Sequence, residues 1–162
     1  MASNRNTTRD SSVATMKHQA EVARGIAGFC WRLQKRALRH DASKLKQPEK
    51  SEFDIATWKL AKMEYGSREY KQSRKDLQKT LDHHYSMNDH HPEHFPNGVS
   101  GMTLDALVEM FYDWSASVKR NKNGDIFESI EINTKRFKLS KQLKSILINT
   151  AIADRAKRRR KK

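Results

Sequence analysis

The stretch "TLDALVEMFYDWSAS" (residues 103–117) shows the helical pattern that decides the fold most plainly. Its large apolar residues recur every three or four positions, as on one side of an amphipathic helix. Thr103 is a favourable residue to cap the start of such a helix. Asp113 lies at the edge of the apolar stripe, beside Met110. The stretch therefore predicts a helix that packs against a core and holds a carboxylate next to it. The stripe consists of Leu104, Leu107, Val108, Phe111 and Trp114.

Other segments carry similar patterns on both sides of this helix. Ser11 or Ser12 can cap a long helix that reaches Leu38, with a stripe that we expect to be buried, and His18 continues this stripe. Residues 46–65 and 67–87 each predict one helix, and a last helix follows its cap at Ser140. Residues 118–139 predict only a turn and a short segment. The stripe of the long helix consists of Val22, Ile26, Phe29 and Leu33.

Composition supports a helical protein, because the chain has only 6 glycines and 3 prolines and rarely alternates apolar with polar residues. We therefore predict an all-α fold, a single bundle of about five to seven helices. Its 162 residues suit one domain, which we place at residues 12–153. Residues 1–11 are expected to be disordered, and residues 154–162 form a basic tail.

Charge and cysteine content limit the classes of function. One cysteine excludes disulfide staples and cysteine-rich zinc fingers. No apolar stretch approaches the roughly 18 residues of a membrane span, and no signal peptide is evident, so we expect a cytoplasmic protein without a membrane partner. The net charge is +14, and residues 155–162 carry seven of the basic groups. Such a tail is typically solvated, but it can also bind nucleic acid.

Histidines are concentrated in one part of the chain. Five of the seven lie between His83 and His94, and the other two, His18 and His40, lie on or beside predicted core faces. One buried histidine is usually a structural residue, but several together with Asp41 and Asp113 favour a shared metal ion. Imidazole and carboxylate ligands suit Mn, Fe, Ni, Co or Zn. An adjacent His-Asp pair suits two ions, because the carboxylate can bridge them.

These residues resemble the HD-domain superfamily of metal-dependent phosphohydrolases. The resemblance lies in the order of His18, His40-Asp41 and Asp113 on helical segments, and in "HDASK" (40–44), which is similar to a His-Asp-x-Gly-Lys motif. More narrowly, the chain resembles a family of small, uncharacterised HD-like proteins of tailed phages and some bacteria. The similar pieces, within residues 16–152, are "HDASKL", "HHPEHF", "LDALVEMFYDWSAS" and "INTKRFKLSKQLKSILINT".

The resemblance implies a role for each matching residue. Lys44 would approach the phosphate or the bridging water, and Asp41 would take part in catalysis. Glu93 would orient a histidine. Arg36 and Arg39 could form a basic approach for substrate, although a solvated helix face is the simpler interpretation. The implied ligands of the first ion are His18, His40, Asp41 and Asp113, and the candidates for a second ion are His84, His90 and His91.

We therefore expect a metal-dependent phosphohydrolase with two divalent transition-metal ions. Its substrate would be a nucleotide or a related phosphorylated small molecule, and its location the cytoplasm, or the host cytoplasm if a phage encodes it. The alternative is a basic nucleic-acid-binding protein in which the histidines hold a structural zinc. A metal-dependent nuclease would combine both hypotheses. The sequence indicates no oligomeric state.

Overall fold

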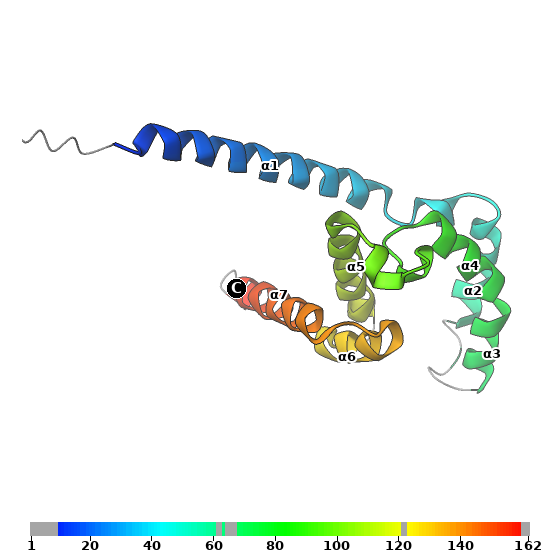
Figure 1. Ribbon diagram of the computed structural model, residues 1–162. Coiled ribbons are helices and arrows are strands. Elements are labelled where there is room, and N and C mark those ends of the chain that lie inside the picture. Colours follow the sequence, from blue (N-terminus) through cyan, green and yellow to red (C-terminus); the bar gives the residue numbers. More distant parts are fainter. Residues whose placement is uncertain (1–9, 61–62, 64–67, 121–122, 160–162) are drawn as a thin grey trace, which may run out of the picture. The chain divides into compact units, whose positions relative to one another are not determined.

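The computed structural model describes residues 10–60, 63, 68–120 and 123–159. Every regular element in these ranges is a helix, which confirms the predicted all-α fold of five to seven helices (Figure 1). Within the described ranges, no helix is both long and apolar enough to cross a lipid bilayer. The α-helices are α1 (Ser12–Arg39), α2 (Glu49–Leu60), α3 (Arg68–Asp76), α4 (Gln78–Met87), α5 (Leu104–Ser117), α6 (Ile126–Phe137) and α7 (Lys141–Arg159).

Two of the predicted boundaries fall at the ends of the described ranges. Most of the N-terminal segment predicted to be disordered, residues 1–9, lies outside them. The basic tail begins inside a helix rather than after it, because α7 continues to Arg159. Residues 160–162 again lie outside the described ranges.

The chain divides into two compact units, Met1–Leu38 and Arg39–Lys162, and each is described by itself. The first unit contains nearly all of α1, which begins at Ser12 as predicted. No residue of α1 is buried, and Val22 and Ile26 are 46% and 59% exposed. The expected burial of the stripe stays a prediction, because the first unit by itself offers nothing that could cover it. Since α1 is the one helix described in its unit, its apolar side chains have no second element there to pack against.

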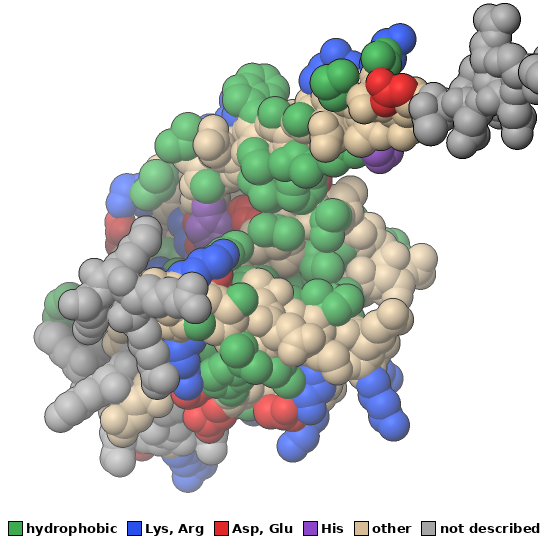
Figure 2. Space-filling view, turned by 90° about the vertical axis from the view of Figure 1, so that its left-hand side faces the viewer, with side chains coloured by type: hydrophobic (Ala, Val, Ile, Leu, Met, Phe, Trp, Pro, Cys, Tyr) green, Lys and Arg blue, Asp and Glu red, His purple; other side chains and the backbone are tan. Residues whose placement is uncertain are grey.

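The hydrophobic core of the second unit lies between α5, α6 and α7. Trp114 of α5 stacks on Phe137 of α6, with ring centroids 6.2 Å apart. Leu104, which we predicted on the buried side of α5, is 62% exposed because it is the first residue of the helix. Apolar side chains also remain on the molecular surface (Figure 2). The buried core residues are Met110, Phe111, Trp114, Ile130, Leu139, Leu147 and Ala151.

The helix starts agree with the predicted caps, but two predicted segments differ. The side chains of Thr103 and Ser140 accept hydrogen bonds from backbone N–H groups of α5 and α7, as expected. The predicted short segment before Ser140 is instead the 12-residue helix α6, capped by Asp125. The single helix predicted over residues 67–87 is divided at Leu77 into α3 and α4.

Short 3-10 turns connect the helices around the candidate site. η1 (Ala42–Leu45) packs against α2 and α4, and η2 (Pro92–His94) packs against α4 and η3 (Gly98–Gly101). A further turn, η4 (Val118–Arg120), follows α5. As a result, the segment after α1, the C-terminal end of α4 and the loop after it face one another within the second unit.

Candidate metal centre

A left-handed turn directs the carboxylate of Asp41 into the centre of the site. Asp41 has φ 57° and ψ 18°, a conformation that aspartate adopts more readily than most residues. The turn is closed by a 2.9 Å hydrogen bond from the Lys44 backbone N–H to the Asp41 carbonyl. The Lys44 ammonium also donates to Asp41 Oδ2 over 2.7 Å. The "HDASK" motif is therefore a compact unit that presents an imidazole, a carboxylate and an ammonium together.

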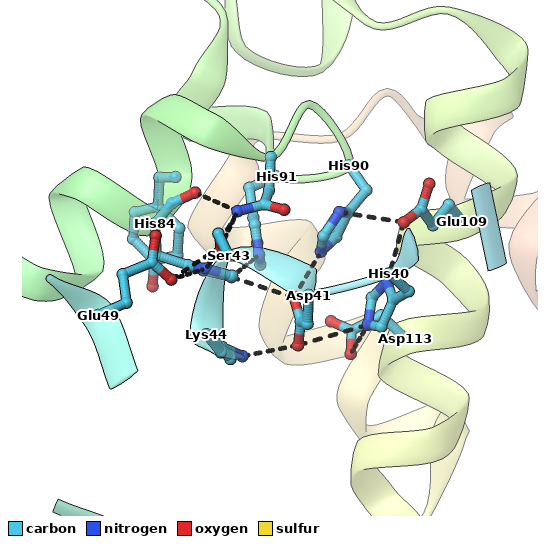
Figure 3. A network of polar contacts seen from close by, with 12 residues as sticks. His40, Asp41, Ser43, Lys44, Glu49, His84, His90, His91, Glu109 and Asp113 are labelled. Atoms are coloured by element: carbon cyan, nitrogen blue, oxygen red, sulfur yellow. Dashed lines mark hydrogen bonds and ion pairs between the residues drawn. The ribbon is translucent and has the colours of Figure 1, made fainter. Parts of the chain in front are cut away.

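The histidines on the opposite side come from the end of α4 and the loop after it. His84 lies in the last turn of α4 and is 1% exposed, and His90 is 2% exposed. The loop turns back sharply, because the His91 N–H donates to the Asn88 carbonyl over 3.2 Å. Pro92 then begins η2 and is buried, which limits the freedom of the loop. This local geometry directs all three imidazoles toward Asp41 (Figure 3).

Asp41, His84, His90 and His91 form a group whose potential ligand atoms all lie within 4.8 Å of one another. His84 Nε2 is 3.1 Å from His91 Nε2 and 3.1 Å from Asp41 Oδ1. His90 Nε2 is 3.5 Å from the same Asp41 oxygen. Two ligands bound at about 2.0–2.2 Å to one ion are separated by about 3–3.5 Å. These spacings fit a divalent ion with little rearrangement.

Two polar atoms in this group are buried without a hydrogen-bond partner among the described residues. They are Asp41 Oδ1 and His90 Nε2, which face each other. An unpaired buried polar atom costs about 1–3 kcal/mol, so native proteins rarely retain one without a reason. A cation between these atoms would satisfy both. The residues present therefore fit a metal ion, and this cluster could hold one.

A second set of contacts surrounds His40. Glu109 and Asp113 lie four residues apart on α5, so both carboxylates project from one face of this helix. His40 Nδ1 is 2.9 Å from Glu109 Oε1, and His40 Nε2 is 3.5 Å from both Asp113 Oδ1 and Asp41 Oδ2. Glu109 Oε1 is also 3.3 Å from His90 Nδ1. His40, His90 and Glu109 form a second group that could hold an ion.

The two histidine environments shift protonation in opposite directions. The Asp113 and Glu109 carboxylates beside His40 raise its pKa to about 10. Burial, together with the neighbouring His90 and His84 imidazoles, lowers the pKa of His91 to about 3. His91 is therefore neutral and has a lone pair for a metal ion at physiological pH.

The acidic groups are held in the ionised form that binds cations. Burial raises the pKa of Asp41, but the His84 and His90 imidazoles and the Lys44 ammonium outweigh it, and the net shift is strongly downward. Burial also raises the pKa of Asp113, and its hydrogen bond with His40 outweighs this effect. Both carboxylates are consequently charged near neutral pH.

The structure brings together most, though not all, of the residues that the sequence indicated. His18 and Arg36 belong to the first unit, where His18 is exposed, so their place beside the cluster stays a prediction. Arg39 is exposed at the end of α1. Glu93, which we expected to orient a histidine, pairs instead with Arg136 over 2.6 Å, because the end of α6 lies against η2.

Sequence reasoning missed two glutamates that contact the histidines. Glu49 is fully buried, and its carboxylate contacts His83 and His84 at 2.9 Å each. Glu109 contacts His40 and His90. The position of Glu109 one turn before Asp113 was a signal that could have identified it. No comparable signal links Glu49 with His84, because the two residues are 35 positions apart.

No curated protein and no solved structure matches this chain. A family model described as "Family of unknown function (DUF5662)" matches residues 7–153, and the chain therefore belongs to that family.

Proposed function

We propose that this protein is a metal-dependent phosphohydrolase that acts on a nucleotide or a related phosphorylated small molecule. The observation that carries the proposal is the convergence of Asp41 with His84, His90 and His91, where two buried polar atoms have no hydrogen-bond partner within the described ranges of the chain. This ligand set suits Mn, Fe, Ni, Co or Zn. The HD-like order of the ligands in the sequence also supports the proposal.

Asp41 lies between two groups of ligands, which favours two ions rather than one. Its Oδ1 faces His84 and His90, whereas its Oδ2 faces His40. One ion would be held by Asp41, His84, His90 and His91. The other would be held on the side of His40 and Asp113.

The exposure of the ligands supports a catalytic site over the structural zinc of the alternative hypothesis. His84 and His90 are closed from solvent, at 1% and 2% exposed. The side chains of Asp41 and Lys44 are accessible to solvent, at 21% and 34% exposed. A structural zinc site is fully closed by its four protein ligands, whereas a catalytic site keeps one position accessible.

Lys44 would contact a phosphoryl group that approaches Asp41 from solvent. Its ammonium lies 2.7 Å from Asp41 Oδ2 and 5.1 Å from the centroid of the Phe53 ring. These contacts hold the charge close to Asp41 while the side chain stays partly exposed. The net charge of +14 would also attract an anionic substrate.

The chemistry is the attack of water on phosphorus, in which a new phosphorus–oxygen bond forms as the bond to the leaving oxygen breaks. When bound, a divalent ion supplies Lewis acidity that activates water near neutral pH and neutralises phosphoryl oxygens. Asp41 and the histidines would hold the ion in place. Lys44 would stabilise the negative charge that grows on the phosphoryl oxygens.

The test is hydrolysis of a panel of nucleotides and phosphomonoesters and phosphodiesters, with Mn, Co, Ni or Zn added to metal-free protein. We expect turnover that requires a metal and that falls at least about 100-fold in Asp41→Asn. Asp82→Asn is the matched control, because Asp82 is an exposed residue of α4 that bonds to Gln78. Turnover that is equal in both variants, or absent with every metal, would refute the proposal.

A further inference from the structure

Three histidines of the site share an orientation that the ligand set alone does not require. His84 has Nδ1 against Glu49 and Nε2 against Asp41. His40 and His90 have Nδ1 against Glu109, and their Nε2 atoms face Asp41. The Glu49 and Glu109 carboxylates thus lie on the Nδ1 side of the imidazoles, and Asp41 lies on their Nε2 side (Figure 3).

We infer that Glu49 and Glu109 are positioning residues, which hold the Nδ1–H groups of His84, His40 and His90 and so direct every Nε2 toward the metal. The inference rests on the metal site of the proposed function, but it does not depend on hydrolysis. Carboxylates that orient ligating histidines in this way strengthen metal binding and fix the tautomer of the ring.

At Glu49 the proton positions follow from the donors and acceptors present. The Glu49 carboxylate is the acceptor shared by three donor groups, Ser43 Oγ, His83 Nδ1 and His84 Nδ1. Ser43 Oγ donates to Glu49 Oε2 over 2.8 Å, and the His84 Nδ1–H donates to the same oxygen over 2.9 Å. His84 Nε2 is then left with a lone pair that faces Asp41 and His91.

Asn88 is consistent with this assignment, although its side-chain nitrogen also lies 3.1 Å from His84 Nδ1. The amide has two N–H groups. One donates to Ser43 Oγ over 2.8 Å, and the other donates to the His84 carbonyl over 2.7 Å. Neither is needed at His84 Nδ1, which remains free to donate to Glu49.

At Glu109 there are two possible arrangements. Its Oε1 could share an ion with the Nδ1 atoms of His40 and His90, or it could accept hydrogen bonds from both. The unpaired atoms decide between them. Among the described residues of the site, His90 Nε2 and Asp41 Oδ1 are buried without a hydrogen-bond partner, so the missing positive charge lies on the Nε2 side of the imidazoles. The Nδ1 atoms of His40 and His90 already have an acceptor, Glu109 Oε1, at 2.9 Å and 3.3 Å.

The experiment is a long-range ¹H–¹⁵N correlation spectrum of the histidine rings in ¹⁵N-labelled wild-type protein loaded with zinc. We expect a retained Nδ1–H and a zinc-bound Nε2 for His40, His84 and His90. Zinc on the Nδ1 atom of His40 or His90 would overturn the inference for Glu109, and zinc on the Nδ1 of His84 would overturn it for Glu49. This measurement needs no variant, so it does not depend on the folding of one.

Substitution supplies a second measurement. Glu49→Gln and Glu109→Gln should each weaken zinc binding about 10- to 100-fold in a chelator competition. At saturating cobalt, the visible absorption spectrum should match that of wild type, because no ligand of the ion is lost. A changed spectrum in Glu109→Gln would show that Glu109 is itself a ligand and would overturn its positioning role. The matched controls are Glu52→Gln and Glu128→Gln, two exposed carboxylates of α2 and α6.

These results separate the inference from the proposed function. The expected zinc-bound tautomers in a protein that hydrolyses no phosphoester would refute the function and support the positioning role. Zinc on an Nδ1 atom in an active enzyme would do the reverse. A protein that binds none of Mn, Co, Ni and Zn would overturn both.

Discussion

Binding of a divalent ion should raise the melting temperature of this protein, and the effect should depend on Asp41. Asp41 Oδ1 and His90 Nε2 are buried without hydrogen-bond partners in the part of the chain that the structure describes, and neighbouring ligand atoms are 3.1–3.5 Å apart. An ion can therefore enter with little rearrangement. Its binding free energy then appears almost entirely as added stability of the folded state.

The magnitude follows from ligand linkage. At a free metal concentration 100 times the Kd, an ion that binds only the folded state stabilises it by about 2.7 kcal/mol. The second unit contains residues 39–162, which is 162 − 39 + 1 = 124 residues. A domain of this size gains about 4 °C in Tm for each kcal/mol, so the expected increase is about 10 °C.

The assay is thermal unfolding followed by circular dichroism at 222 nm. Protein is first treated with a chelator, and Mn, Co, Ni or Zn is then titrated. Asp41→Asn should lose most of the increase, whereas Asp82→Asn, on the exposed face of α4, should retain it. An increase of the same size in both variants would mean that the metal binds elsewhere, and no increase with any of the four metals would refute the reasoning.

Three further predictions concern catalysis, the helix cap and the core. Lys44→Met should lower kcat/KM about 100-fold without changing metal content, measured by steady-state kinetics and elemental analysis; a loss of metal would instead make Lys44 structural. Asp125→Ala removes the α6 cap, in which the Phe127 N–H donates to the carboxylate, and should cost about 1 kcal/mol in urea unfolding at pH 7. This hydrogen bond lowers the pKa of Asp125 from its ordinary value of 3.8. The difference in unfolding free energy between wild type and Asp125→Ala should therefore be complete above about pH 4 and disappear as the pH falls below it. A difference that persists under acid conditions would contradict the assignment. Ile130→Ala, at a fully buried position, should cost about 2–5 kcal/mol by the same method, and a cost below 1 kcal/mol would contradict its place in the core.

Local features of the sequence were sufficient to predict most helices. Thr103 and Ser140 cap α5 and α7 as predicted, because a cap depends on a side chain and a backbone N–H only three residues away. The same reasoning failed for α6. There Asp125 was an available cap, but Asn133 and Thr134 interrupt the apolar spacing between Ile130 and Phe137.

Burial was less predictable than helicity. A stripe at helical spacing shows that a helix has an apolar face, but it does not show whether another element covers that face. On α5, Leu104 of the predicted stripe is 62% exposed, whereas Met110, placed at the edge of that stripe, is 1% exposed. Such differences arise from packing between helices and cannot be read along a single one.

The sequence by itself determined that the chain is helical and that it has enough imidazole and carboxylate groups for a metal site. The tertiary structure decided which of these groups meet: Asp41 lies against His84, His90 and His91, and Glu93 pairs with Arg136 instead of a histidine. It also introduced Glu49 and Glu109, which the sequence pattern had not indicated. The physical reason is range, since helix formation depends on neighbours within about four residues, while the contacts of the site join positions as far apart as His40 and Asp113.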